Sequence, residues 1–296
     1  GLGDVYKRQH YNSFDSGFPI TTHYNITNGK QTSLPFQFWN FTKTTDEKIL
    51  YASLNMTRLC SYREGYGYNT TPSFASTALS ESNYLRFYLV NQVGAYELLC
   101  SLEQDQLLDI ARECLSTTNF YLNHALFSPD SSSCVFCIHS AAVAAKDTQL
   151  LYYNLSSRTY HALLPGFVVS HHCYISNTEL LICVIKDGQT SYIIYDLEAF
   201  TLSKALSDYN VDGHPCYVQN RLIIDTYPNR LGIQKLLTSN SIEQSPKEFF
   251  SLFSPKTINN GPYRVDFHPR VDILNKLVWI DALQKGYRQL LAVELP

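Results

Sequence analysis

Residues 124–138 read HALFSPDSSSCVFCI, and three later stretches repeat the same order of features: HHCYISNTELLICVI (171–185), HPCYVQNRLIID (214–225) and HPRVDILNKLVWID (268–281). Each stretch begins with a histidine, passes through a small polar turn and ends in a β-branched or aromatic run. The four histidines stand 47, 43 and 54 residues apart. In the last three repeats a glycine turn then leads to a final strand, with the turns at Gly188, Gly232 and Gly286.

A repeat of this length built from short strands predicts a β-propeller with one small sheet per repeat. We expect an all-β propeller of six or seven four-stranded blades in the intact protein, with part of the first blade absent here. Residues 1–9 (GLGDVYKRQ) resemble translated sequencing-adapter read-through from metagenomic gene fragments, so they are excluded from fold reasoning. Residues 10–296 are expected to form one domain, with repeats at about 118–165, 166–206, 207–252 and 253–296 and earlier blades within about 10–117.

The part before residue 118 has no opening histidine but does contain strand and helix signals. Alternating residues predict strands at 36–41 and 48–56, and a hairpin turns at Gly94. Residues 10–35 are expected to be the end of a broken repeat or a loop. Residues 104–114 (QDQLLDIAREC) have apolar residues at helical spacing, which predicts a short helix between blades.

Composition excludes several classes of function. The 296 residues are 45% hydrophobic and 14% aromatic with a formal net charge of −3, which gives no basic field for nucleic acid. No apolar run has the length of a membrane span. The eight cysteines lie mostly in apolar runs, where free cysteine acts as a small hydrophobe. Cys134 and Cys137 would face opposite sides of a strand, so a shared metal ion is disfavoured.

The last repeat concentrates charge on one expected strand. In YRVDFHPRV (263–271), alternation predicts that Arg264, Asp266, His268 and Arg270 share one face. Such groups are costly to bury without partners, so we expect them to line a watery channel or to bind an anion. Asp266 and His268 could ligate a metal or steer a base, while Arg264 or Arg270 pairs with a substrate carboxylate. The alternative is an Arg–Asp–Arg network that only solvates the channel mouth.

The shared position of the four histidines gives the main functional lead. Equivalent positions in successive blades point to one axis, so His124, His171, His214 and His268 are predicted to form a ring of imidazoles. His171 and His172 are adjacent and only one can point inward; the distance to the following turn favours His171, and His172 stays open as the alternative.

The segments FSPDSSSCVFCIH, LNHALFSPD, VSHHCYIS and VDFHPRVD resemble TolB-like propellers and, among them, oligogalacturonate lyases, over residues 118–296. These lyases are manganese-dependent enzymes that cleave pectin fragments by β-elimination. The resemblance implies that His124 is the base and that His171 and His268 bind the metal. It also implies a histidine and a glutamine at positions where this chain has Asp266 and Tyr263. We add His214 to the expected metal ligands because it shares the register.

Two functions follow as expectations. The first is a metal-assisted lyase that acts on an acidic, uronate-containing oligosaccharide by β-elimination with a divalent cation, for which the resemblance implies manganese. The second is a non-catalytic TolB-like propeller that binds a glycan or a protein at its channel mouth, associated with bacterial surface polysaccharide. A peptidase accessory domain is disfavoured because no G-x-S-x-G motif occurs. A cytoplasmic location is favoured over a periplasmic one.

Overall fold

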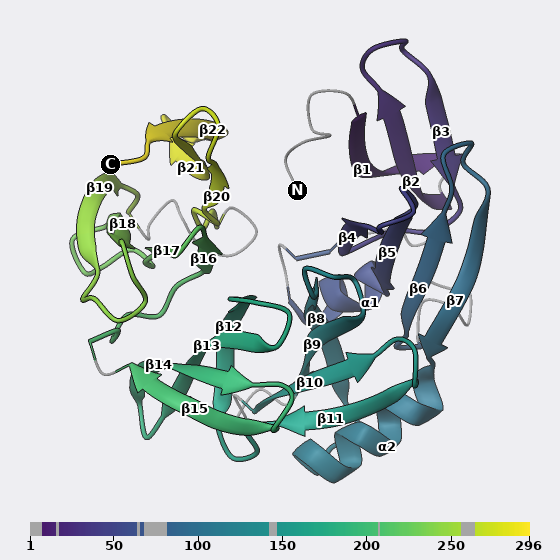
Figure 1. Ribbon diagram of the computed structural model, residues 1–296, viewed down its shortest axis with the longest axis horizontal. Coiled ribbons are helices and arrows are strands. Elements are labelled where there is room, and N and C mark those ends of the chain that lie inside the picture. Colours follow the sequence, from purple (N-terminus) through teal and green to yellow (C-terminus); the bar gives the residue numbers. More distant parts are fainter. Residues whose placement is uncertain are drawn as a thin grey trace. The chain divides into compact units, whose positions relative to one another are not determined.

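The computed structural model describes residues 8–15, 18–63, 66–67, 82–141, 147–206, 208–255 and 264–296. It divides into two compact units, Gly1–Pro165 and Gly166–Pro296. Within the described residues the strands form six antiparallel sheets, four of four strands and two of three (Figure 1). No helix of these residues has both the length and the apolar character needed to cross a membrane.

The first unit contains three sheets and two helices. Its first sheet has three strands: β1 (Arg8–Asp15), β2 (Phe18–Asn25) and β3 (Gln31–Leu34). The second sheet has four: β4 (Asn40–Lys43), β5 (Ile49–Leu54), β6 (Leu85–Val90) and β7 (Tyr96–Leu102). The third also has four: β8 (Phe120–Phe127), β9 (Ser133–Ser140), β10 (Thr148–Asn154) and β11 (Thr159–Leu163). The helices are α1 (Met56–Tyr62) and α2 (Gln104–Leu115).

The second unit contains the other three sheets. One has the strands β12 (Val168–Tyr174), β13 (Glu179–Lys186), β14 (Gln189–Asp196) and β15 (Thr201–Leu206). The next has β16 (Pro215–Val218), β17 (Arg221–Asp225), β18 (Ile233–Ser239) and β19 (Lys247–Phe253). The last has three strands: β20 (Arg270–Asp272), β21 (Leu277–Gln284) and β22 (Tyr287–Glu294).

Inner and outer strands of a sheet differ in burial. The second strand of the β12–β15 sheet, β13, has a fully buried apolar run at Leu180–Val184, whereas the fourth strand, β15, is exposed along most of its length. A strand buried on both faces reads as a continuous apolar run, and an outer strand does not. The core lies between successive sheets, as where Leu181 and Ile194 pack with Leu222 of the next sheet.

The glycine turns were expected and are present. Gly188, Gly232 and Gly286 all have positive φ and directly precede the strands β14, β18 and β22. The expectation that each turn leads to the final strand holds only for β22, because β15 and β19 follow the other two. At Gly232 a Cβ atom would also lie 2.8 Å from Cα of Pro255, so a side chain there would clash with the chain as well as strain the backbone.

Residues 10–35 belong mostly to the three-stranded sheet β1–β3, which agrees with the first of the two alternatives, the end of a broken repeat. Two other expectations about local structure were wrong. The strand expected to reach residue 56 ends at Leu54, because Asn55 caps α1 by accepting a hydrogen bond from the Arg58 amide at 3.0 Å. Residues 264–269 are not a strand; pairing begins only at Arg270. The helix α2 was expected and buries Leu107, Ile110 and Ala111.

Candidate metal and substrate site

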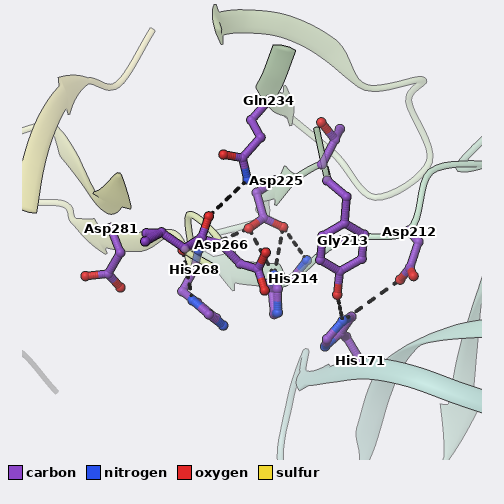
Figure 2. Close-up of polar contacts among 12 residues, drawn as sticks. His171, Asp212, Gly213, His214, Asp225, Gln234, Asp266, His268 and Asp281 are labelled. Carbon is purple, nitrogen blue, oxygen red and sulfur yellow. Dashed lines mark hydrogen bonds and ion pairs between the residues drawn. The ribbon is translucent and has the colours of Figure 1, made fainter. Parts of the chain in front are cut away.

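Three of the four repeat histidines meet in the second unit. The first strands of its sheets are neighbours, β12 beside β16 and β16 beside β20. His171 lies in β12, His214 directly precedes β16 and His268 precedes β20. The ring centroids of His171 and His214 are 3.9 Å apart, and those of His214 and His268 are 4.0 Å apart. The imidazoles therefore form a contiguous row, which we call the histidine row (Figure 2).

Irregular backbone accompanies two members of this row. In β12, Val169 pairs with Val184 and His171 with Cys183, so the partner strand has no residue opposite Ser170. Such a bulge changes the direction in which the following side chain points. His268 has φ of 44°, a left-handed conformation that is uncommon outside glycine. Of the adjacent pair in β12, His171 is the residue whose ring lies against His214.

Asp225, the last residue of β17, connects two histidines of the row. It is 1% exposed. Its Oδ1 accepts the backbone N–H of His214 at 2.5 Å, and its Oδ2 accepts the backbone N–H of His268 at 3.0 Å. The Nδ1 atom of His214 lies 3.0 Å from both carboxylate oxygens. The carboxylate thus holds one imidazole ring and two backbone segments from neighbouring sheets (Figure 2).

At the other end of the row, His171 has polar neighbours of its own. Its Nε2 is 2.8 Å from the Tyr227 hydroxyl and 3.9 Å from Oδ1 of Asp212. The Ser170 hydroxyl donates to the same Asp212 oxygen at 2.6 Å. Burial, and then the charge of Asp212, raise the pKa of Tyr227, so this phenol stays protonated at neutral pH.

The charged residues of the last repeat form two separate ion pairs. Arg264 contacts both oxygens of Asp266, with Nε to Oδ1 at 3.0 Å and Nη2 to Oδ2 at 2.7 Å. Its guanidinium also lies 4.6 Å from the centre of the Tyr227 ring. Arg270 pairs instead with Asp281 at 3.0 Å on the surface. The single strand face expected to carry all four side chains is therefore wrong, because the segment before Arg270 is irregular.

The histidines of the row differ in their tendency to protonate. Burial lowers the pKa of His214, but the carboxylates of Asp225, Asp266 and Asp212 together more than offset this, and the net shift is upward. His268 is exposed as a residue. Neighbouring protein atoms still remove water from around its ring, and His214 adds positive charge, so the pKa of His268 is lowered. Two imidazoles in contact do not readily carry a proton each. A neutral His268 keeps a nitrogen lone pair that a metal ion could take.

The fourth repeat histidine, His124, lies in the first unit beside two further potential ligands. Ligand atoms of His124, Cys137 and His139 lie within 4.8 Å of one another. A bulge between Asn123 and Leu126 interrupts the pairing of β8 with β9, and His124 within it has φ of 53°. The ring of His124 is 6.1 Å from that of Trp39 and meets the ring of His139 edge-on at 6.2 Å.

His139 is held as a neutral imidazole. Its Nε2 contacts Oδ1 of Asn123 at 2.5 Å, and its Nδ1 contacts the Thr148 hydroxyl at 2.9 Å. One N–H donor and one acceptor nitrogen satisfy both contacts. Burial, followed by the positive charge of Arg63, lowers the pKa of His139 to about 3. The eight cysteines are free thiols, and burial raises the pKa of Cys137, in line with the core role expected for it.

No protein-family model matches the sequence, and no curated protein matches it. Solved structures do. An oligogalacturonate lyase in complex with manganese matches 97% of this chain and 74% of its own length with a TM-score of 0.61 at 13% identity. The Dos1 propeller matches 93% of this chain and 62% of its own with a TM-score of 0.51 at 10% identity. The chain has a β-propeller fold.

TolB from Acinetobacter baumannii also matches the propeller, over 85% of this chain and 53% of its own, with a TM-score of 0.47 at 11% identity. The fold that the sequence resemblance to oligogalacturonate lyases indicated, a β-propeller, is confirmed by the match to the lyase structure. Within the described residues, the six sheets agree with the lower of the two expected blade numbers, although the first and last sheets have three strands rather than four.

A divalent cation fits one group of side chains in the second unit of the propeller. Ligand atoms of His214, Asp266 and His268 lie within 4.8 Å of one another. Two imidazoles and a carboxylate suit a divalent first-row metal. A carboxylate that holds the other nitrogen of a ligating histidine is common around protein metals, and Asp225 does this for His214. His171 lies beside this group but is not a member of it, and Tyr263 lies outside the described residues.

Three residues of this site, Asp212, Asp225 and Tyr227, were not expected from the sequence. The stretch DTYP (225–228) begins with the last residue of the buried strand β17 and places polar groups at its end, so it contained a signal. The sequence could not indicate which groups the side chains of Asp212, Asp225 and Tyr227 contact. Their partners lie elsewhere in the chain, in β12, at His214 and in the segment before β20.

Proposed function

We propose that the propeller is a metal-assisted lyase that acts on an acidic, uronate-containing oligosaccharide by β-elimination. The observation that carries the proposal is the histidine row with the Arg264–Asp266 pair beside it. This group combines potential ligands for a divalent cation with a cation that could bind a carboxylate. The fold-level similarity to a manganese complex of oligogalacturonate lyase supports the same choice of metal and substrate class.

In this proposal His214, His268 and Asp266 hold the cation, and His171 is a further ligand as the resemblance implies. The bound ion would act as a Lewis acid on the uronate carboxylate and make the neighbouring C5 proton more acidic. Arg264 would bind that carboxylate, with Arg270 as the other candidate. Either guanidinium could pair with the carboxylate through two parallel hydrogen bonds.

Proton removal needs a neutral base, and the resemblance assigns this role to His124. The imidazole nitrogen takes the C5 proton, the electron pair of the C5–H bond becomes the C4–C5 double bond, and the C4–O bond breaks. The departing oxygen takes up a proton and leaves as an alcohol. The products are one unsaturated uronate and one shorter oligosaccharide, so atoms and electrons balance without an added oxidant.

A second candidate is a non-catalytic propeller that binds a glycan or a protein. The observation in its favour is that Arg264 engages both oxygens of Asp266 and that Tyr227 contacts Nε2 of His171. These polar groups are therefore satisfied by neighbours within the chain. Such a site could recognise a polar ligand through its outer surface and need no ion.

Metal binding and product formation together separate the two candidates. The protein would be incubated with manganese and oligogalacturonate, then with other uronate oligosaccharides, while the ultraviolet absorbance of the unsaturated product is followed. The lyase should bind one manganese ion and form product, and His268→Ala should lose both properties. His161→Ala is the control, because His161 is exposed on β11 in the first unit. Oligosaccharide binding by metal-free protein, with no product from any uronate, would favour the second candidate.

A further inference from the structure

Asp225 is a fully buried carboxylate at the centre of the candidate site, and an ionised group in that position is costly. Removing such a charge from water costs several kcal/mol unless hydrogen bonds replace the water. Asp225 receives these bonds from the backbone N–H groups of His214 and His268 and from the His214 ring. All of these donors belong to residues of the histidine row, so the carboxylate is placed to serve that row.

Both oxygens of Asp225 are needed for this arrangement. Oδ1 accepts from the His214 amide, Oδ2 accepts from the His268 amide, and Nδ1 of His214 lies at 3.0 Å from each oxygen. An asparagine has one acceptor oxygen and would direct its NH₂ group toward one of these N–H donors. The arrangement is therefore specific for a carboxylate, whereas a residue that only filled space would tolerate the amide.

The chain approaches Asp225 closely just before His214. A Cβ atom on Gly213 would overlap the backbone carbonyl of Asp225 and would lie 3.0 Å from its Oδ1. The Tyr192 hydroxyl donates to the Gly213 carbonyl at 3.1 Å and fixes the segment from its other side. Only glycine allows the His214 amide to come within hydrogen-bonding distance of the carboxylate here.

These contacts determine which nitrogen of His214 carries the proton. A carboxylate accepts and does not donate, so Nδ1 of neutral His214 must be the N–H nitrogen and Nε2 must hold the lone pair. The same carboxylate fixes the backbone at His268, where φ is 44° and the side-chain direction depends on that conformation. One group thereby sets the tautomer of one ligand and the position of the other.

We propose that Asp225 is a positioning residue that presents Nε2 of His214 and the side chain of His268 to a divalent cation. This inference rests on the proposed function for the identity of the ion. It assigns to Asp225 a role in metal affinity and not only in stability. Loss of an outer-shell partner of this kind commonly lowers metal affinity by about 10- to 100-fold.

The first test is the ring tautomer of His214 in metal-free wild-type protein, read from the NMR shifts of its two nitrogens and assigned with His214→Gln. We expect a proton on Nδ1 and none on Nε2 at a pH where the ring is neutral. A proton on Nε2 would overturn the proposal. This measurement needs no metal, and the tautomer itself is read in the wild-type protein.

The second test compares Asp225→Asn with Asp272→Asn by manganese titration. Asp272 is a matched control, since it is also a buried aspartate of the second unit but holds the turn at Asn275. We expect Asp225→Asn to lose the fixed tautomer and to bind manganese about 10- to 100-fold more weakly, while Asp272→Asn keeps the wild-type affinity. Equal affinities in all three proteins would overturn the proposal. A wild-type protein that binds no manganese would refute the proposed function, and the tautomer would still decide the role of Asp225.

Discussion

Replacing Arg264 by glutamine should destabilise the metal-free protein through Asp266. The Asp266 side chain is 3% exposed and both its oxygens contact Arg264. Breaking a buried pair from one side leaves an uncompensated charge and costs about 3–5 kcal/mol. The Arg264 side chain is 32% exposed, so water can partly replace it. We therefore expect the lower end, a loss of about 3 kcal/mol in the free energy of unfolding.

Manganese should reverse most of this loss. Without Arg264, the carboxylate of Asp266 no longer has to exchange a guanidinium for a metal ion, so the variant should bind manganese more tightly than the wild type. An ion present at a hundredfold excess over its dissociation constant stabilises the folded state by about 2.7 kcal/mol. Urea unfolding with and without manganese measures both effects. Activity is expected to fall, because the variant lacks the proposed carboxylate-binding group.

Arg270→Gln is the matched control for this experiment. It removes an arginine from the pair with Asp281, whose side chains are 48% and 33% exposed, and surface pairs are worth about 0–1 kcal/mol. The reasoning would be refuted if the two variants lost the same stability. It would also be refuted if manganese stabilised the wild type and Arg264→Gln equally, because Asp266 would then not be a ligand that competes with Arg264.

Three further predictions concern single positions. Burial lowers the pKa of His139 from 6.5 to about 3. Between pH 6.5 and about pH 3 the imidazole is therefore protonated in the unfolded chain and neutral in the folded protein, so the free energy of unfolding should fall as pH drops through that range. His139→Gln should reduce the dependence of stability on pH by up to about 1.4 kcal/mol per pH unit, measured by urea unfolding at successive pH values. An unchanged pH dependence would contradict the burial of His139. Gly213→Ala should cost about 1–3 kcal/mol by forcing its Cβ against Asp225, and calorimetric titration should show weaker manganese binding. Wild-type affinity would mean that the segment can shift at no cost to the site. Phe267→Ala should cost about 3–5 kcal/mol, seen as a lower melting temperature, since Phe267 is fully buried in the core of the last two sheets. A loss below 1 kcal/mol would mean that this core can collapse into the space.

Much of the fold could be predicted because its signals are local. The β-branched and aromatic run of β14 and the turn at Gly188 involve residues near one another in the chain, and both are readable from sequence. The register of the histidines likewise predicted a ring of four with His124, and three of them, His171, His214 and His268, meet in the second unit. What the sequence could not supply was the pairing between segments far apart, such as the contact of Asp225 with His268 across 43 residues.

The errors have physical reasons of the same kind. Residues 264–269 alternate like a strand, but their hydrogen bonds go elsewhere: the Phe267 carbonyl accepts from the Asp281 amide and the Arg264 carbonyl from Arg288. The apolar run through residue 56 predicted one long strand. The side chain of Asn55 instead accepts the Arg58 amide and caps a helix that begins at Met56. In both places the residues do have the pattern of a strand, but hydrogen bonds to other partners give a different structure.

The bulge at Ser170, opposite Val184 and Cys183, separates the direction of the His171 side chain from the packing of the residues before it in β12. A regular strand would couple the two. Along an unbroken strand, shifting one side chain to the other face shifts all of them, so the packing of the whole sheet would change. A single extra residue at Ser170 confines that change to one position. Deleting Ser170 should therefore leave His171 opposite Cys183 and keep the pairing of Cys173 and Tyr174, with only the local twist of β12 reduced. One strand thus carries its imidazole and its inner apolar residues in two separate stretches, joined by a residue that neither stretch needs for pairing.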